Sequence, residues 1–181
     1  MAVTTLDPKT ALIVVDLQQS VVSLPTVHPM DDVVKRVRVL TEAFRGRGLP
    51  VVLVNVDGVA PGRTEREFLA GWTDLIPELN QPPKDHVVTK HTPGAFTNAD
   101  LEAHLRSLGV MQVVIVGVAT SNGVEVTARQ IYELGFKVTV ATDAMTDLHA
   151  DAHTYSITRI FPKIGETGTT QEIIDVLKRS A

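Results

Sequence analysis

The chain has 181 residues, of which 44% are hydrophobic and 21% charged, and its formal net charge at pH 7 is −4. This length and composition fit one globular domain, residues 1–181, with a substantial core. The mild acidity and the lack of a long basic run argue against nucleic acid as the main partner, and no apolar run approaches the roughly 18–20 residues that cross a bilayer.

Apolar runs that do not alternate with polar residues indicate buried parallel strands. They lie at residues 11–15, 50–56, 86–89, 113–117 and 137–141. Helical patterns lie at residues 31–45, 100–108, 124–134 and, more weakly, 150–158. The spacing of Thr169 and Glu172 is that of a capping box and predicts a final helix. Four glycines follow helical stretches, where left-handed C-caps are expected: Gly46, Gly48, Gly109 and Gly135.

Strands and helices therefore alternate along the chain. Repeated βαβ units predict an α/β fold, a doubly wound parallel sheet with helices on both faces. In such sheets ligands bind beyond the carboxyl ends of the strands, near the topological switch point. Asp16, Lys90 and Gly123 each follow a predicted strand, so we expect them to converge at this edge.

The most informative segment is residues 113–129, VVIVGVATSNGVEVTAR. A buried strand runs into a tight turn and then into a helical pattern, an arrangement in which enzymes often mount a nucleophile or bind an anion. Whatever stands at position 123 is aimed at the mouth of the sheet. That residue is Gly123, which has no side chain to react.

The segment resembles the pattern G-V-x-T-x-x-C-V-x-x-T-A of the isochorismatase-like hydrolase family. The matching positions are Gly117, Val118, Thr120, Val124, Thr127 and Ala128. The family's cysteine falls on Gly123, while Asp16 in VVDLQ and Lys90 in TKHTPGAF match two further landmarks. The resemblance implies that Asp16, Lys90 and Gly123 occupy the positions of the catalytic aspartate, lysine and cysteine.

In cysteine-bearing relatives the aspartate takes the thiol proton and the lysine stabilises charge. The chain has no cysteine, so the covalent route is closed. True isochorismatases also have glycine at this turn, and there the aspartate protonates the carbon of a vinyl ether before water attacks. They carry Tyr and His where Ala119 and Ser121 stand here. The resemblance thus implies a hydrolase in which Asp16 acts as general acid or base.

The expected substrate is a small anionic or carbonyl-bearing metabolite. The candidate substrate-binding residues are Gln18, Phe96, Ala119, Thr120, Ser121 and Asn122. Trp72 and Phe68 are further candidates to line the pocket, with core packing as the alternative. The resemblance also implies a non-proline cis peptide at Val118–Ala119 and a homo-oligomer, a dimer or larger.

We expect no metal and no cofactor. Metal-binding nicotinamidase relatives carry an Asp-x-His motif after the second strand, and the corresponding residues 55–58 contain no histidine. His149 and His153 are four residues apart, a spacing that can pair two imidazoles on a metal, but we expect them to form a polar helix face.

Each site residue also has a structural interpretation. Asp16 is a candidate cap of the following turn, Lys90 a solvated surface lysine, and Gly123 a position that needs a positive φ or a close backbone approach. The alternative function is a non-catalytic small-molecule binding protein of the same fold. An amidase disabled by an engineered Cys→Gly change is a third interpretation. The first ten residues lack the order of a signal peptide, so a cytoplasmic location is expected.

Overall fold

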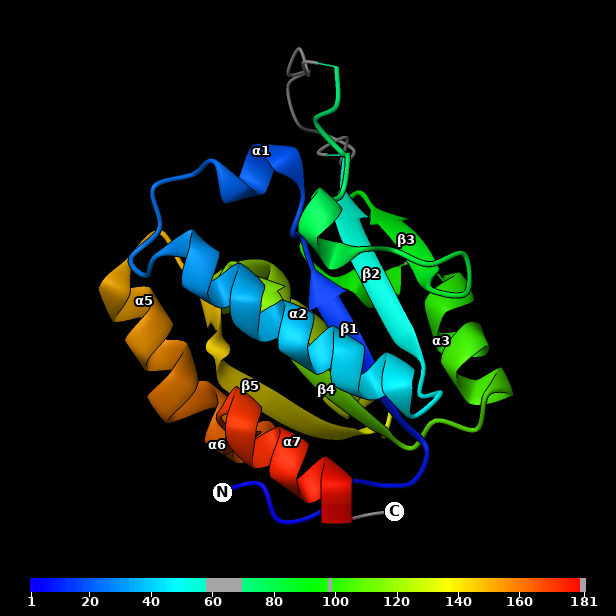
Figure 1. The fold of residues 1–181 in the computed structure, drawn as a ribbon. Helices are drawn as coiled ribbons and strands as arrows, with labels where there is room; N and C mark the ends of the chain where they lie inside the picture. The colour runs from blue at the N-terminus through cyan, green and yellow to red at the C-terminus, as the bar shows by residue number, and fades with distance from the viewer. Residues whose placement is uncertain (58–69, 98, 180–181) are drawn as a thin grey trace.

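The computed structural model describes residues 1–57, 70–97 and 99–179. In this part of the chain six strands form one parallel sheet, in the order β3-β2-β1-β4-β5-β6 (Figure 1). The strands are β1 (Thr10–Val15), β2 (Val51–Val56), β3 (His86–Lys90), β4 (Gln112–Val118), β5 (Lys137–Thr146) and β6 (Glu166–Gly168). The predicted fold class is confirmed.

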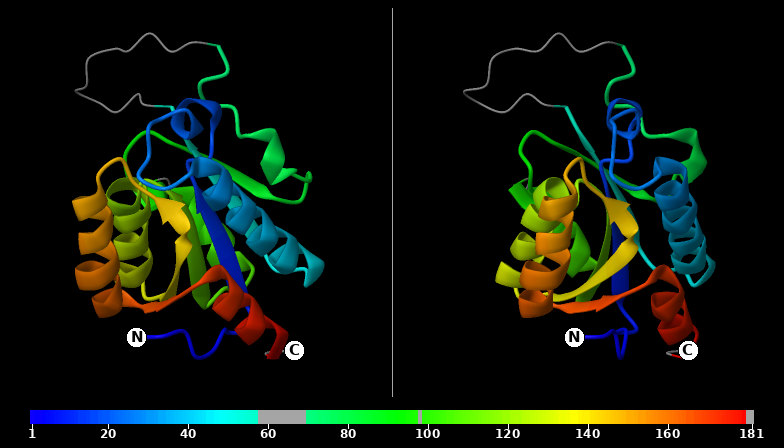
Figure 2. Two further views of the ribbon diagram at one scale, coloured as in Figure 1. Left: turned by 60° about the vertical axis from the view of Figure 1, so that its left-hand side comes forward. Right: turned by 90° about the vertical axis from the view of Figure 1, so that its left-hand side faces the viewer.

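Helices cover both faces of the sheet (Figure 2). They are α1 (Gln19–Val22), α2 (Met30–Gly46), α3 (Ala99–Ser107), α4 (Glu125–Glu133), α5 (Ala150–Tyr155), α6 (Phe161–Ile164) and α7 (Thr170–Arg179). Short 3₁₀ turns occur at Pro77–Leu79 and Ala95–Thr97, and π-helical turns at Thr120–Val124 and Ser156–Ile160. Helices α2 and α7 pack on one face, and α3, α4 and α6 on the other.

The central strand β1 is buried on both faces, which explains why its sequence is apolar throughout. Leu12 and Val14 belong to the core on the α2 side, whereas Ile13 and Val15 belong to the core on the α4 side, and all four are buried. A strand buried on both faces has no polar positions to alternate with.

The structure differs from the sequence prediction at several elements. Strand β6 was not predicted, since Glu166–Gly168 is three residues long and not apolar. Strand β5 continues to Thr146, five residues beyond the predicted end, with a register shift against β4. Gly48, Gly109 and Gly135 have the expected positive φ. The prediction for Gly46 was wrong, because this residue is the last of α2.

The order of the strands places the topological switch point between β1 and β4, since the chain leaves β1 toward β2 on one side and returns to β4 on the other.

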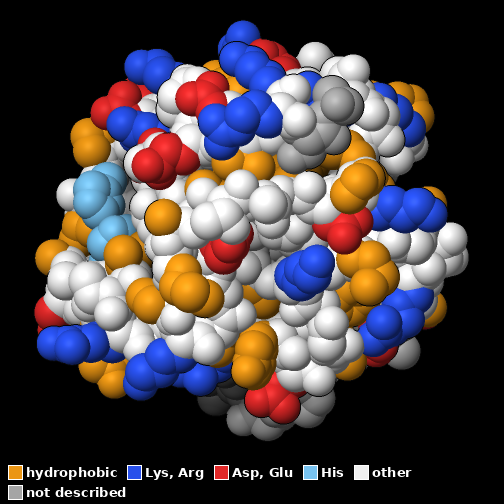
Figure 3. All heavy atoms as spheres, turned by 90° about the horizontal axis from the view of Figure 1, so that it is seen from below, with side chains coloured by type: hydrophobic (Ala, Val, Ile, Leu, Met, Phe, Trp, Pro, Cys, Tyr) orange, Lys and Arg blue, Asp and Glu red, His pale blue; other side chains and the backbone are white. Residues whose placement is uncertain are grey.

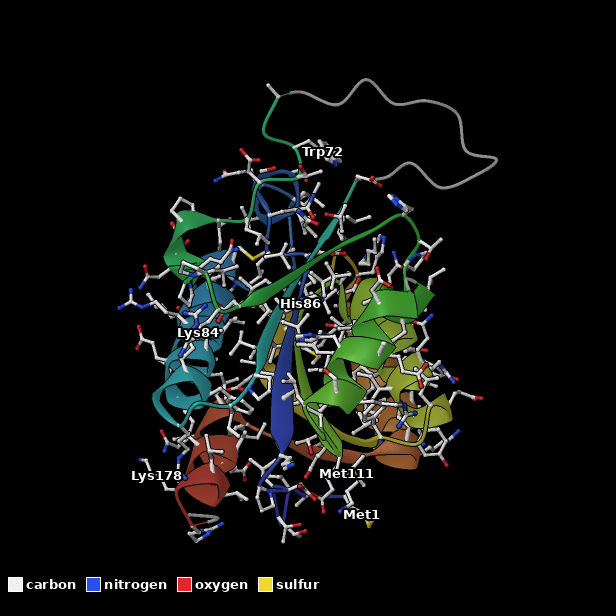
Figure 4. All side chains as sticks on the ribbon, turned by 90° about the vertical axis from the view of Figure 1, so that its right-hand side faces the viewer. Met1, Trp72, Lys84, His86, Met111 and Lys178 are labelled. Atoms are coloured by element: carbon white, nitrogen blue, oxygen red, sulfur yellow. The ribbon has the colours of Figure 1, made fainter. Side chains whose placement is uncertain are left out.

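Trp72 lies at the carboxyl end of the sheet, at the opposite end of the molecule from Met1 and Met111 (Figure 4). On the surface around the termini, positive and negative side chains are intermingled (Figure 3). Among the described residues, no helix has the length and apolar character needed to cross a membrane.

Candidate active site

Asp16 is the first residue after β1 and lies at the switch point. Its backbone is left-handed, with φ +53°, and its N–H donates to the Val54 carbonyl of the neighbouring strand at 2.8 Å. The residue is only 6% exposed. Its two carboxyl oxygens differ, because Oδ2 lies 2.8 Å from Lys90 Nζ whereas Oδ1 is buried without a hydrogen-bond partner in the described part of the chain.

Lys90 is the last residue of β3, two strands away from β1 in the sheet. Its side chain is 3% exposed and reaches Asp16 across the end of β2. The interpretation of Lys90 as a solvated surface lysine is therefore wrong. A buried ammonium beside a buried carboxyl is costly unless the two groups are paired, and here they are.

Burial raises the pKa of Asp16 from 3.8 to about 6, while the charge and the hydrogen bond of Lys90 act in the opposite direction. With such a pKa, the carboxyl group is protonated in roughly a tenth of the protein molecules at pH 7. Asp16 can therefore both donate and accept a proton near neutral pH, as a general acid or base must.

Gly123 lies in the turn that joins β4 to α4, which follows a cis peptide bond between Val118 and Ala119. The expected cis bond is thus present. A Cβ atom at position 123 would lie 3.2 Å from Asp16 Oδ2 and 3.1 Å from Val15 Cγ1. The φ of Gly123 is not positive, so the glycine is not required here for a left-handed backbone. The alternative, a close backbone approach, is confirmed, because the turn at Gly123 lies directly against Asp16.

Two contacts from the β5–α5 segment hold this turn in place. The Ser121 N–H donates to Asp147 Oδ2 at 2.7 Å, and Thr120 Oγ1 lies 2.8 Å from His153 Nδ1. Asp147 is 2% exposed, and its Oδ1 accepts the N–H groups of Leu148 and His149. Burial alone would raise its pKa, but these hydrogen bonds, that of Ser121 first, hold the pKa of Asp147 below its usual value.

Asp147 is not among the site residues predicted from the sequence. The missed signal was an aspartate directly after a buried strand, the same position that Asp16 has after β1. His153, expected on a polar helix face, is instead half-buried beside Thr120. Burial and the neighbouring His28 lower its pKa, against the opposing charge of Asp147.

The prediction that Gln18 binds substrate has to be corrected. Gln18 is fully buried, and its Oε1 accepts the Val56 N–H at 2.7 Å. Its Nε2 lies 3.0 Å or less from three acceptors, namely Ser20 Oγ and the carbonyls of Val56 and Trp72. A primary amide has only two N–H donors, so this fully buried side chain has no donor left for a ligand. It joins β1 to β2 and to the segment that carries Trp72.

Phe96 also lies elsewhere than expected. Its ring packs toward Phe136 at the start of β5, with 6.4 Å between ring centroids, and it borders a hollow of about 300 Å³ on the outer side of α4. We therefore leave Phe96 out of the proposed site. Phe68 lies outside the described residues.

The remaining candidates lie in the β4–α4 turn or at its start. Ala119 and Ser121 are half-buried, Asn122 is exposed, and Thr120 is fully buried. Trp72 is half-buried at the carboxyl end of the sheet (Figure 4). The structure thus brings Asp16, Lys90 and the turn together.

This architecture is that of a doubly wound α/β protein with a buried acid–base pair at the switch point. A family model described as the isochorismatase domain matches residues 10–172. The chain belongs to the isochorismatase family. It is 34% identical to the isochorismatase family protein YwoC of Bacillus subtilis (strain 168), over 94% of this chain and 95% of that protein. It is 35% identical to YecD of Escherichia coli O157:H7, over 93% of this chain and 96% of that protein.

The fold comparison agrees with the sequence comparison. The structure of an isochorismatase family protein from Burkholderia thailandensis superposes with a TM-score of 0.88 at 38% identity. The match covers 96% of this chain and 98% of that chain. The similarity therefore extends over nearly all of both chains.

Proposed function

We propose that this protein is a hydrolase that acts on a small metabolite without a covalent thiol intermediate and uses Asp16 as its proton donor. The observation that carries the proposal is the environment of this carboxyl. Oδ2 is held by Lys90, Oδ1 is buried without a partner among the described residues, and burial raises the pKa to about 6. An acid of this strength matches a proton transfer near neutral pH.

The absence of cysteine makes this chemistry the natural one for the site. With Gly123 at the end of the turn, no thiol stands beside Asp16 that would need a base. The proton of Asp16 is therefore free to go to the substrate. In the proposed first step Asp16 Oδ1–H protonates a substrate whose protonated form is an oxocarbenium ion or an activated carbonyl.

The second step returns the proton. Water attacks the cationic carbon, and the Asp16 carboxylate takes one proton from that water. The neutral adduct then collapses to a carbonyl: its hydroxyl proton passes to the leaving atom as the bond to the leaving group breaks. One water is consumed and the acid is regenerated, so atoms and charges balance. Lys90 Nζ, which lies 2.8 Å from Asp16 Oδ2, would stabilise the carboxylate between the steps through a charge-assisted hydrogen bond.

The substrate class follows from this chemistry. Vinyl ethers are the first candidates because carbon protonation makes them labile to water, and small esters and amides with an anionic group are the second. The homo-oligomeric state and the cytoplasmic location remain predictions. Analytical ultracentrifugation of the purified chain measures the oligomeric state.

The test is a panel of vinyl ethers, esters and amides turned over by the wild type and by Asp16→Asn. A positioned acid contributes about 10²–10⁴-fold, so kcat should fall by that factor while the circular dichroism spectrum is kept. Asp85→Asn is the matched control. Asp85 is also a buried carboxylate paired with a cation, Arg45, but it precedes β3 and lies at the other end of the sheet.

Two outcomes contradict the proposal. Unchanged kcat in Asp16→Asn would remove Asp16 from the chemistry. No turnover on any member of the panel, together with tight ligand binding that Lys90→Met abolishes, would identify the protein as a binding protein that retains the pocket.

A further inference from the structure

Two histidines that are distant in the sequence face each other beside the β4–α4 turn. His28 precedes α2 and His153 lies in α5, and their ring centroids are 4.6 Å apart with an interplanar angle of 60°. From the sequence we expected His153 to lie with His149, four residues earlier, on a polar helix face. The structure pairs it with His28 instead.

Each ring is held by a hydrogen bond at its Nδ1 atom. His28 Nδ1 lies 3.0 Å from Thr146 Oγ1, and His153 Nδ1 lies 2.8 Å from Thr120 Oγ1. Both threonines are fully buried, one at the end of β5 and one in the turn after β4. The Thr146 oxygen also accepts the backbone N–H of His28 at 3.2 Å, which favours an acceptor role toward the ring as well.

A neutral histidine that donates from Nδ1 keeps the lone pair of Nε2 in the plane of its ring. In the described part of the chain, neither Nε2 atom has a hydrogen-bond partner. Fixing Nδ1 by an oxygen acceptor is how proteins orient histidines that bind a metal through Nε2. The two threonines would supply such outer contacts if both histidines bound one ion.

We propose that His28 and His153 form a binding site for one borderline divalent transition-metal ion of the Zn²⁺, Ni²⁺ and Cu²⁺ type. With a metal–nitrogen bond of about 2.1 Å, each ring centre lies about 3.2 Å from the ion. Ring centres 4.6 Å apart then subtend an angle of about 90° at the ion, which suits two neighbouring ligands.

The angle between the ring planes is the second requirement. A bound ion must lie in both ring planes, and two planes at 60° intersect along a line on which it can lie. The chain contains a matched pair that fails this requirement. His86 and His104 are 3.9 Å apart but stacked, with an interplanar angle of 11°, so an ion in the plane of one ring lies out of the plane of the other.

The surroundings also suit a cation. Asp147, buried beside the turn, is close enough to His153 to interact with it electrostatically. No group of three or more histidine, cysteine or acidic side chains in the described residues forms a closed metal site. Water or a small anion would therefore fill the remaining coordination positions, and His28, which is exposed, leaves them accessible. The bound ion would join the segment before α2 to helix α5.

The test is isothermal titration of the full chain, without an added histidine tag, with ZnCl₂. The proposal predicts one Zn²⁺ per chain, an affinity at least about 10-fold weaker in His28→Ala, and an unchanged affinity in His104→Ala. Because His28 is exposed, His28→Ala should keep its fold, which thermal unfolding checks. Absence of saturable binding in the wild type, or wild-type affinity in His28→Ala, would overturn the proposal.

Electron paramagnetic resonance with Cu²⁺ counts the nitrogen atoms that bind the ion, a number that does not change if a histidine contributes only to packing. The wild type should show coupling to two nitrogens, and His28→Ala and His153→Ala should each show at most one. Two-nitrogen coupling in both variants would place the ion elsewhere and overturn the assignment. Neither experiment needs a substrate, so the result is independent of the proposed hydrolase activity.

Discussion

At the scale of single residues, the two oxygens of the Asp16 carboxyl group have different surroundings. Lys90 fixes the orientation of Asp16 through Oδ2, which leaves Oδ1 as the atom that exchanges a proton in the proposed mechanism. A thiol at position 123 would be next to this carboxyl, and the glycine removes it. The chain thus holds Asp16 and Lys90 in contact, with no thiol beside them.

Gly123→Cys should introduce a reactive thiol. Its Cβ would lie 3.2 Å from Asp16 Oδ2, so the neighbours must move by a few tenths of an ångström, and the start of α4 together with Lys90 should lower the thiol pKa. Because the wild type has no cysteine, alkylation by iodoacetamide at pH 7 reports on this thiol alone. Its rate should exceed that of Ser107→Cys, an exposed control. An equal or slower rate would show that position 123 is not activated.

The sequence predicted Asp16 and Lys90 because both stand in motifs at strand ends, and topology brings strand ends together. It failed for Gln18 because the saturation of an amide depends on which backbone atoms surround it, and these come from β2 and from the segment at Trp72. The pairing of His28 with His153 involves residues 125 positions apart, and no periodicity of the sequence predicts such a contact.

At the scale of elements, the close pairing of β1 with β4 is what brings the turn to Asp16. Gly117 pairs with Val15 in the sheet and has φ +120°. A Cβ atom at this position would overlap the Val15 carbonyl oxygen and lie 2.7 Å from the Val15 nitrogen. Both atoms belong to the backbone of a buried central strand, which has no room to yield.

Gly117→Ala should therefore lower the free energy of unfolding by about 3–5 kcal/mol, in the range of the most damaging substitutions. Gly46→Ala is the control, since nothing lies within 4 Å of its Cβ position at the end of α2, and it should stabilise by up to about 1 kcal/mol. Urea denaturation measures both. Equal effects of the two substitutions would contradict the role given to Gly117.

The pattern of apolar runs predicted the central strands and the large helices because each has a face, or both faces, buried in the core. Strand β6 escaped prediction because an edge strand of three residues leaves no such pattern. The end of β5 escaped because Thr142 and Asp143, which are half-buried, interrupt its apolar run. Asp143 instead accepts hydrogen bonds from the N–H and the hydroxyl of Thr170 at the start of α7.

At the scale of the whole molecule, the buried acid has a thermodynamic cost. Asp16 binds its proton more tightly in the folded chain, with a pKa of about 6, than in the unfolded chain, with a pKa near 3.8. A raised carboxyl pKa stabilises the fold at low pH, and this contribution is lost as the pH rises through the folded value. The role proposed for Asp16 near neutral pH therefore costs stability.

The difference in unfolding free energy between the wild type and Asp16→Asn should accordingly decline as the pH rises from 4 to 7, by about 2 kcal/mol. Denaturation by urea at several pH values measures it. A difference that stays level or grows in favour of the wild type over this range would mean that burial does not raise the pKa of Asp16.

The most direct measurement is the pH dependence of kcat/KM for a turned-over substrate, compared between the wild type and Asp16→Asn. If protonated Asp16 is the proton donor, kcat/KM of the wild type should be level below pH 6 and fall about tenfold per pH unit above a midpoint near 6. The residual activity of Asp16→Asn should lack this transition. A wild-type profile that rises through pH 6, or a transition that persists in Asp16→Asn, would contradict the assignment of Asp16 as the general acid.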